Sequence, residues 1–391
     1  MKRRDFVAAG SAMAGALQAQ AKLRVGLIGA GGRGRYVAKT FLNNPDVTFG
    51  AVCDVYEPNL EKGLSETGNQ GRAYRNYKQL LADATIPVVL IATPEHWHHR
   101  MVLDALAAGK DVYVEKPLCH TWQEGVELVA AARKSKSVVQ VGMQRRSYDA
   151  YLKGREVVAA GELGKVRMIR SWWINNQLNR QSRPLAGPLD WEQWQGPALK
   201  RGPLDPDRFN DWRSYTEYSG GIVADQGAHA FDGMNMLTAA GYPIAVNASA
   251  GPPLRPKVDT AESVVVCAEY AAPLLAVFSV NYAAMRYESK NDQLSQLDGD
   301  AARMDIGRVG FRVFRQGAED KPAISFDSPL GFGNATNLHV TNFLECVRTR
   351  ATPTAPVEIG FQSALPVLLA NLSLKLGRRV KWNATKMAAD L

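Results

Sequence analysis

The chain has 391 residues, of which 46% are hydrophobic and 22% charged, an ordinary composition for a globular protein of two or three domains. This composition excludes a disordered, collagen-like or disulfide-scaffold protein. The net charge of +9 is spread without a long basic run or a nucleic-acid-binding motif. We therefore interpret it as a generally basic surface and expect no nucleic-acid partner.

The first 21 residues are typical of an export signal rather than of a folded domain. A basic start, Lys2 to Arg4, precedes a weakly apolar run from Phe6 to Leu17, and Ala19-Gln20-Ala21 offers small residues for cleavage. The pattern Arg3-Arg4-x-Phe6 is similar to a twin-arginine signal. We expect export to the periplasm, or a cytoplasmic location if the signal is not functional. The apolar run is short and rich in Ala and Gly, so no stable membrane span is predicted.

A glycine-rich segment between a predicted strand and a predicted helix indicates a dinucleotide site. The strand Leu23–Ile28 runs into Gly29-Ala30-Gly31-Gly32-Arg33-Gly34, which fits GxGxxG, and a helical stretch from Arg35 to Asn43 follows. Gly29 permits a tight turn, Gly31 lets the backbone approach a pyrophosphate, and Gly34 lets the helix pack closely on the strand. The helix N-terminus then favours the phosphates.

The next predicted strand, residues 47–54, ends in an acid suited to a ribose. Asp54 follows Gly34 by 20 residues, the usual spacing for an acid that binds ribose hydroxyls. Its carboxylate would repel a 2′-phosphate, so NAD is favoured over NADP. Arg33 and Arg35 lie close by and weaken that preference.

Strands and helices continue to alternate, which predicts a doubly wound parallel sheet. The predicted strands are residues 87–92, 111–114 and 138–141, and the predicted helices are residues 98–108 and 121–134. In such a sheet, ligands bind beyond the carboxyl ends of the strands. The segments expected to converge there are 29–34, 54, 93–99, 115–117 and 142–146. The four cysteines form no CxxC pair, so we expect free thiols and no metal site.

Four motifs, taken in order, resemble the Gfo/Idh/MocA family of oxidoreductases (glucose–fructose oxidoreductase, inositol dehydrogenase and relatives). They are Gly29–Gly34, Ala92-Thr93-Pro94-Glu95-His96-Trp97-His98, residues 108–117 ending in Glu115-Lys116-Pro117, and Gly220-Gly221 through Asp225-Gln226-Gly227-Ala228-His229. The Glu-Lys-Pro element is the most specific. The resemblance runs from about residue 22 to the end of the chain.

The resemblance implies an NAD(P)-binding Rossmann domain, residues 22–145, and a C-terminal α/β domain for substrate and oligomerisation, residues 146–391. The second domain would have an open, mostly antiparallel sheet, and its predicted strands are residues 166–173, 245–250, 261–270 and 274–282. This sheet often makes the subunit contact in the family. The resemblance therefore also implies a homo-oligomer, either a dimer or a tetramer.

The resemblance further implies three catalytic residues, Lys116, Asp225 and His229. The lysine would hydrogen-bond the substrate hydroxyl beside the nicotinamide and help to move its proton. Asp225 and His229 are four residues apart, so a helix opened by Gly220-Gly221 would place both on one face. His229 would be the general base, and Asp225 would orient its imidazole or bind another hydroxyl. Without the resemblance, His229 would be interpreted as an ordinary core histidine.

Further positions complete the predicted site. The cofactor-binding residues expected beyond the glycine loop and Asp54 are Thr93, Pro94, His98, Glu115, Lys116 and Gln144. The substrate-binding residues expected are Arg145, Trp172, Trp173, Asp225 and His229. Arg145 would clamp a hydroxyl or carboxylate, or alternatively form a surface ion pair. Five of the eight tryptophans lie between Trp172 and Trp212, a predicted long loop that packs on a sugar or forms a lid or subunit contact.

Three functions stay open at this level. The first is an NAD(P)-dependent oxidoreductase acting on a sugar, polyol or sugar derivative, with a cofactor that is retained if the protein is exported. The second is an NAD-dependent glycoside hydrolase or lyase that oxidises its substrate transiently, eliminates the glycosidic group and returns the hydride. The third is a non-catalytic nucleotide- or sugar-binding relative, which the presence of all three catalytic residues disfavours.

Overall fold

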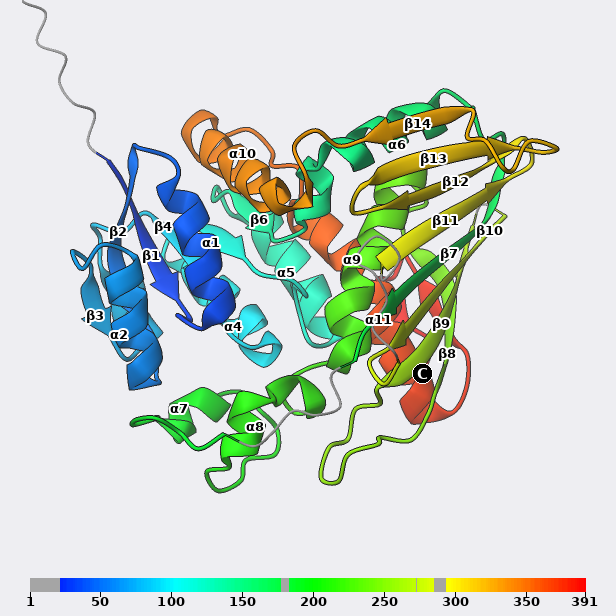
Figure 1. Ribbon diagram of the computed structural model, residues 1–391. Helices are drawn as coiled ribbons and strands as arrows, with labels where there is room; N and C mark the ends of the chain where they lie inside the picture. The colour runs from blue at the N-terminus through cyan, green and yellow to red at the C-terminus, as the bar shows by residue number, and fades with distance from the viewer. Residues whose placement is uncertain (1–21, 177–182, 272, 285–292) are drawn as a thin grey trace, which may run out of the picture.

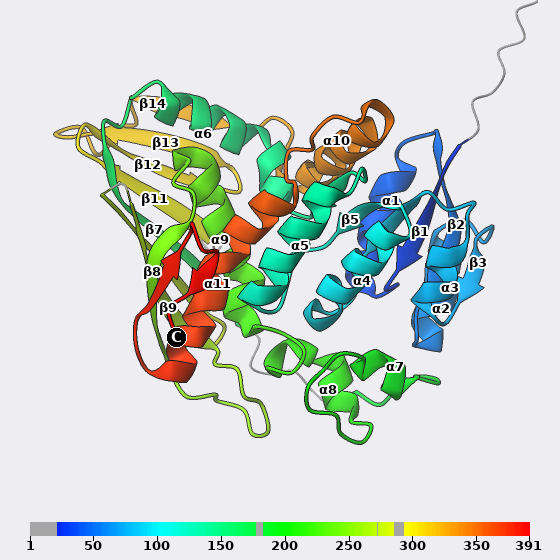
Figure 2. The same cartoon turned by 180° about the vertical axis from the view of Figure 1, so that it is seen from behind.

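The computed structural model describes residues 22–176, 183–271, 273–284 and 293–391, and the predicted export signal lies outside the described residues. Two sheets stand side by side, with helices packed between and around them (Figure 1; Figure 2 shows the reverse side). The fold class expected from the sequence is confirmed, because a Rossmann-like parallel sheet is followed by a mostly antiparallel one.

The first sheet is parallel, with the strand order β3-β2-β1-β4-β5-β6. The chain reverses its direction of travel between β1 and β4, which opens a crevice at the carboxyl ends of these two strands. The strands are β1 Leu23–Ile28, β2 Val47–Cys53, β3 Arg72–Tyr74, β4 Val88–Ile91, β5 Asp111–Val114 and β6 Val139–Val141. The helices are α1 Gly32–Leu42, α2 Glu57–Glu66, α3 Tyr77–Ala82, α4 Glu95–Ala107 and α5 Trp122–Lys134.

Local sequence explains most of these elements. Strands β4 and β5 are buried along their whole length, as expected for the apolar centre of a parallel sheet. A capping box between Thr121 and Glu124 starts α5. Two predicted helix starts were too late, because α1 begins at Gly32 rather than Arg35, and α4 at Glu95 rather than His98. In both cases the motif residues themselves form the first helical turn.

The second sheet has ten strands in the order β14-β13-β12-β11-β7-β10-β9-β8-β15-β16. All its pairings are antiparallel except that of β7 with β10. The strands are β7 Val166–Ile174, β8 Pro243–Ala250, β9 Ser263–Tyr270, β10 Leu274–Asn281, β11 Gln293–Gly299, β12 Ala302–Gly307, β13 Gly310–Arg315, β14 Ile324–Asp327, β15 Val380–Asn383 and β16 Ala388–Ala389. The remaining elements are η1 Gln144–Ser147, α6 Asp149–Ala159, α7 Trp191–Gln195, α8 Pro206–Asn210, η2 Trp212–Ser214, α9 Gly221–Thr238, η3 Phe332–Asn334, α10 Ala335–Thr349 and α11 Val357–Leu376.

Helix α9 is the central element of the molecule, and nearly all of its residues are buried. Small residues let its neighbours approach closely: a Cβ atom on Gly227 would lie 2.5 Å from Val367, and one on Gly233 would lie 2.8 Å from Tyr151. Polar residues on this helix are therefore held in fixed positions by dense packing.

The last two long helices join the domains. Helix α10 packs against α1, and its Val340, Phe343 and Leu344 belong to the same core cluster as β1. The C-terminal part of the chain thus also covers the Rossmann domain. Helix α11 has the length and apolarity of a membrane span, but 67% of that stretch is buried against α9, α5 and β8. In this structure α11 is a core helix.

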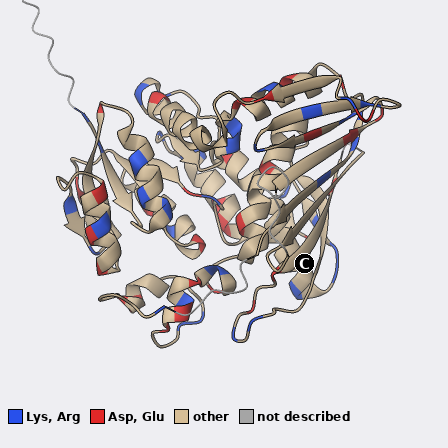
Figure 3. Ribbon diagram, in the orientation of Figure 1, with Lys and Arg blue, Asp and Glu red and all other residues tan. Residues whose placement is uncertain are grey.

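The surface carries mixed charge. Figure 3 shows Lys and Arg interspersed with Asp and Glu over both domains in that view. The cysteines are free: Cys53, Cys119 and Cys346 are buried, and Cys267 is half-buried. The outer face of the ten-stranded sheet carries no helix within the described ranges (Figure 1).

Candidate active site

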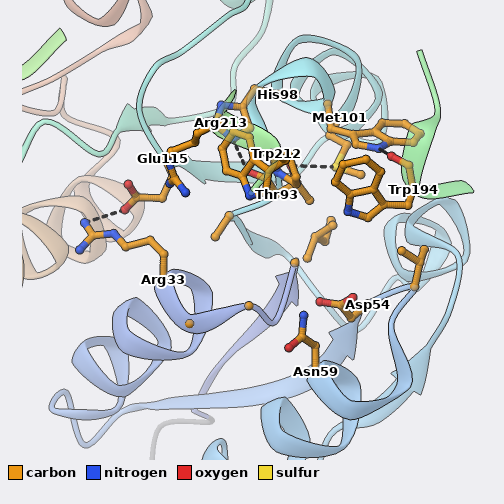
Figure 4. Close-up of a pocket in the computed structure, with 18 of the residues that line it drawn as sticks. Arg33, Asp54, Asn59, Thr93, His98, Met101, Glu115, Trp194, Trp212 and Arg213 are labelled. Atoms are coloured by element: carbon orange, nitrogen blue, oxygen red, sulfur yellow. Dashed lines mark hydrogen bonds and ion pairs between the residues drawn. The ribbon is translucent and has the colours of Figure 1, made fainter. Parts of the chain in front are cut away.

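A cavity of about 570 Å³ opens at the carboxyl ends of β1 and β4, where the order in which the chain adds strands to the parallel sheet reverses. It is bounded by the glycine loop, by the segments that follow β2, β4 and β5, by α9, and by residues 193–213. Figure 4 shows Arg33 and Glu115 on one side of it and Asp54 with Asn59 on another. The five segments predicted to converge do each supply lining residues.

The glycine loop has the geometry of a phosphate cradle. Gly29 adopts φ +86°, and a Cβ atom there would lie 2.8 Å from the backbone of Ala92. A Cβ atom on Gly34 would lie 2.0 Å from the carbonyl oxygen of Gly29. By contrast, a Cβ atom on Gly31 or Gly32 would meet no protein atom within 4 Å, and both residues line the cavity. The open space at the N-terminus of α1 therefore fits a pyrophosphate.

Asp54 lies where a ribose would bind. Its Oδ2 accepts a hydrogen bond from the Ala30 N–H at 2.8 Å, and its Oδ1 accepts one from the Tyr56 N–H at 2.9 Å. Burial raises the pKa of Asp54 to about 6 despite these bonds. Asn59 lines the same part of the cavity. Ala30 and Gly34 do not line it, since they shape the loop from behind.

Two strand-end loops are joined by His98. Its Nδ1 lies 2.6 Å from the Pro117 carbonyl oxygen and its Nε2 lies 2.9 Å from the Thr93 carbonyl oxygen. Burial lowers the pKa of His98, so the ring is neutral and donates its single N–H to one of these carbonyls. Thr93, Pro94 and His98 all line the cavity, as predicted.

Lys116 and Asp225, which both line the cavity, form a buried ion pair. Lys116 Nζ lies 2.5 Å from Asp225 Oδ1 and 2.7 Å from the Asp225 carbonyl oxygen. Although burial opposes ionisation, Lys116 and Arg213 hold the pKa of Asp225 well below its ordinary value. Beside this pair, Arg33 forms an ion pair with Glu115 at 2.8 Å.

His229 projects into the cavity from α9, one turn after Asp225. Burial and the nearby Lys116 lower the pKa of His229, so its imidazole is neutral. Its Nδ1 has no hydrogen-bond partner among the described residues. Its ring stacks on that of Trp173, with 6.2 Å between the ring centroids. Within the residues that the structure describes, no hydrogen bond joins Asp225 to His229. Asp225 thus holds Lys116, and the stacked tryptophan orients the imidazole instead.

Three of the predicted substrate residues do not line the cavity. Trp172 and Trp173 belong to β7, in agreement with the predicted strand 166–173 and not with the predicted loop, and the ring of Trp173 stacks on His229. Arg145 is buried, and its guanidinium donates to Tyr151 Oη at 2.9 Å and to Gln293 Oε1 at 3.0 Å. Its neighbour Gln144 does line the cavity.

Glu95 links the Rossmann domain to the start of α9. Its carboxylate is fully buried and accepts hydrogen bonds from Ser219 Oγ at 2.7 Å and from the Gly220 N–H at 2.8 Å. Burial raises the pKa of Glu95. Glu95 therefore holds the start of the helix that carries Asp225 and His229.

Residues 183–220, here called the covering segment, close one side of the cavity, and sequence reasoning missed most of their role. The segment contains α7, α8 and η2 rather than only irregular loop. Its side chains that line the cavity are Gln193, Trp194, Phe209, Asn210, Trp212 and Arg213. The concentration of tryptophans was a signal for this segment, but nothing in the local pattern indicated where it packs.

The covering segment is joined to the Rossmann domain immediately after Asp54. Leu189 forms an antiparallel bridge with Tyr56, and the Asp190 N–H donates to the Val55 carbonyl at 2.9 Å. Farther along, Trp97 Nε1 donates to the Trp194 carbonyl at 2.8 Å. The segment thus packs over the cavity beside Asp54.

Two family models match the chain. Residues 23–143 match the model described as "Oxidoreductase family, NAD-binding Rossmann fold", and residues 151–304 match the "GFO/IDH/MocA C-terminal domain". The chain belongs to the Gfo/Idh/MocA family of oxidoreductases. Its first domain is the family's NAD-binding domain, and NAD is its cofactor.

Curated relatives of this Gfo/Idh/MocA protein match mainly over part of their length. An inositol 2-dehydrogenase of Salmonella typhimurium is 29% identical over 155 residues, which are 39% of this chain and 46% of that protein. A "Glycosyl hydrolase family 109 protein 1" of Shewanella sp. (strain MR-4) is 27% identical over 215 residues, 52% of this chain and 42% of that protein. The matches thus span less than half of each of these relatives.

Solved structures extend the likeness to the whole fold. A levoglucosan dehydrogenase in complex with NADH and levoglucosan superposes with a TM-score of 0.75 at 18% identity, covering 92% of this chain and 99% of that one. The WlbA dehydrogenase from Bordetella pertussis, in complex with NADH and UDP-GlcNAcA, gives 0.72 at 19% identity, covering 93% and 99%. At these identities the likeness establishes the shared fold of both domains.

Proposed function

We propose that this protein is an NAD-dependent oxidoreductase that transfers hydride between a CH–OH group of a sugar, polyol or sugar derivative and the nicotinamide. The observation that carries the proposal is one continuous cavity. The glycine loop and Asp54, which fit a dinucleotide, line the same cavity as Lys116, Asp225 and His229. Two of the relatives, an inositol 2-dehydrogenase and a levoglucosan dehydrogenase, support this substrate class.

The site residues divide the reaction between them. Bound NAD supplies the hydride acceptor at its nicotinamide. Lys116, held by Asp225, donates a hydrogen bond to the alcohol oxygen and stabilises the charge that develops there. The neutral His229 accepts the hydroxyl proton as the C–H hydride leaves and the C=O bond forms. In the reverse direction His229 returns that proton.

The test is NADH formation at 340 nm with a panel of sugars and polyols. We expect Lys116→Met and His229→Asn to lower kcat/KM by about 10²–10⁴-fold, the usual contribution of a positioned acid or base. The matched controls are Lys153→Met and His99→Asn, whose side chains pair with Glu156 and Glu127 outside the cavity. If the site variants react at the rate of the controls, this assignment of the site is wrong.

A second candidate function is redox-neutral glycoside cleavage. In that reaction, oxidation of a ring hydroxyl acidifies the neighbouring C–H, loss of that proton breaks the glycosidic C–O bond, water adds, and the hydride returns to the ring. The covering segment favours this candidate, since a segment that packs over the cavity beside Asp54 would slow the release of the nucleotide between oxidation and hydride return. Release of nitrophenol from nitrophenyl glycosides, without added NAD and without net NADH, would distinguish it from a dehydrogenase.

We further propose that the cofactor is retained and that the protein is exported. Retention is measured by denaturing protein purified without added nucleotide and identifying what is released by mass spectrometry. Near-stoichiometric NAD supports retention, and its absence with binding on titration indicates free exchange. Export is tested by fractionating cells that express the wild type or the paired change Arg3→Lys and Arg4→Lys. The homo-oligomer expected from the family is tested by light scattering.

A further inference from the structure

Arg213 places a guanidinium beside the predicted catalytic residues from outside the Rossmann domain. It belongs to η2, Trp212–Ser214, and lines the cavity together with Lys116 and His229. Its Nε lies 3.4 Å from Asp225 Oδ2. The Arg213 side chain is 36% exposed, against 12% for Lys116, so it is the more accessible of the two cations. Figure 4 shows Arg213 and Trp212 together at the cavity.

The guanidinium is held in place before any ligand arrives. It lies over the ring of Trp212 at 4.1 Å from the ring centroid. The backbone of η2 is anchored by Thr260 Oγ1, which donates to the Arg213 carbonyl at 3.4 Å, and by an ion pair of Arg255 with Asp211 at 2.5 Å. A planar guanidinium that is already ordered loses little entropy when it binds a planar anion.

Arg213 shares its counter-ion, because the carboxylate of Asp225 also pairs with Lys116 at the shorter distance. Asp225 Oδ1 accepts from Lys116 at 2.5 Å and its Oδ2 accepts from Gln226 at 2.8 Å. Arg213 Nε has no aligned hydrogen-bond partner among the described residues, although it contacts Asp225. Of the other cavity cations, Lys116 is paired with Asp225 and Arg33 with Glu115. A positive charge is thus left facing the cavity.

The position of this charge distinguishes it from the pyrophosphate site. The pyrophosphate cradle is built by Gly31 and Gly32 at the N-terminus of α1, in the Rossmann domain. Arg213 instead adjoins Asp225 on α9, beside the group that holds Lys116. Trp212 next to it lines the cavity with an aromatic surface, on which the apolar face of a sugar ring can pack.

We propose that Arg213 binds an oxyanion substituent, a carboxylate or a phosphate, on the sugar substrate, so that this site takes sugar acids or sugar phosphates in preference to neutral sugars. This inference rests on the proposed oxidoreductase function for its substrate class. Arg213 is then the residue that determines specificity, because a guanidinium pairs with an oxyanion through two parallel hydrogen bonds.

The experiment compares matched sugars that differ only at C6: glucose, glucuronate and glucose 6-phosphate, with the corresponding galactose and mannose series. Binding to the wild-type enzyme–NADH complex is measured by calorimetry, and turnover at 340 nm. We expect an anionic sugar to bind about 10- to 100-fold more tightly than its neutral partner, the range for a charge-assisted hydrogen bond. The carboxylate and phosphate arms show which oxyanion the site prefers.

Three variants complete the test. Arg213→Met should remove the preference and leave the Kd of NADH unchanged. Arg213→Lys keeps the charge without the planar fork, so a folded protein with a weakened carboxylate preference is expected. Arg201→Met is the matched control, since Arg201 is an exposed arginine of the covering segment that does not line the cavity.

Several results would overturn the inference. Equal binding of neutral and anionic sugars by the wild type removes the preference itself. An equal loss for both classes in Arg213→Met assigns Arg213 to the support of Asp225, and a loss of NADH affinity assigns it to the nucleotide. If no sugar is oxidised but the anionic preference is present and depends on Arg213, the proposed function fails while the specificity inference stands.

Discussion

The Lys116–Asp225 pair is expected to be strongly coupled, so removing both charges should cost less stability than the two single losses add up to. The side chains are 12% and 11% exposed, and Nζ lies 2.5 Å from Oδ1. Breaking a buried pair by removing one member costs about 3–5 kcal/mol, because a charge is left without its partner. We therefore expect large single effects and a smaller-than-additive double effect.

The contacts of each member set the size of the two single losses. Lys116→Met leaves Asp225 with Gln226 at 2.8 Å and with Arg213 at 3.4 Å, so its charge stays partly compensated. Asp225→Asn leaves Lys116 with the residue 225 carbonyl at 2.7 Å and an uncharged amide. We expect unfolding free energies lowered by about 1–2 kcal/mol for Lys116→Met and about 3 kcal/mol for Asp225→Asn, with a coupling energy of about 1.5–3 kcal/mol.

The assay is a double-mutant cycle by urea unfolding of NADH-free protein. The control cycle uses Lys153→Met and Glu156→Gln, an exposed pair at 2.8 Å whose coupling should stay below about 0.5 kcal/mol. A coupling at 116 and 225 no larger than that of the exposed pair would refute the reasoning, because it would mean that the buried charges do not depend on each other.

Three further predictions concern the nucleotide site and pH. Gly31→Ala should weaken NADH binding, measured by fluorescence titration, and leave the free energy of unfolding unchanged. Gly34→Ala should lower the free energy of unfolding in urea by about 1–3 kcal/mol or more, because its Cβ atom meets a backbone oxygen. Equal effects of the two variants in both assays would contradict the cradle geometry. Burial raises the pKa of Asp54 to about 6, and the ionised carboxylate is the better acceptor for ribose hydroxyls. The NADH affinity of the wild type should therefore rise from about pH 5 to about pH 7, and that of Asp54→Asn should not. A flat wild-type profile would count against this role of Asp54. The pKa of Asp225 in the folded protein lies below the unfolded value of about 4. The stability advantage of the wild type over Asp225→Asn should therefore be present above about pH 4 and be lost as the pH falls below it. A constant difference between the urea midpoints of the two proteins from pH 7 to pH 3 would exclude this linkage.

Short-range patterns in the sequence were sufficient for much of the fold and for the centre of the candidate site. Asp54 lies at the expected spacing after the glycine loop because both belong to one strand–turn–helix–strand unit. Asp225 and His229 lie on one face of α9 because they are four residues apart in a helix. Apolar runs and alternation likewise predicted five of the six strands of the parallel sheet and four of the ten strands of the second sheet, whereas β3 and β11 to β16 were not predicted. The predicted domain boundary at residue 145 stays a prediction.

Only the tertiary structure decided which polar groups meet in the cavity. Arg145 was predicted to face the substrate but is held by Tyr151 and Gln293, while Arg213, which no local pattern singled out, lies beside Asp225. Asp225 was expected to orient His229 or to bind another hydroxyl, and the structure pairs it with Lys116, which is 109 residues away in the chain. The sequence by itself determined the elements and the residue types of the site, because these depend on contacts between near neighbours. The partners of each charge depend on how distant segments pack, and no spacing along the chain encodes that.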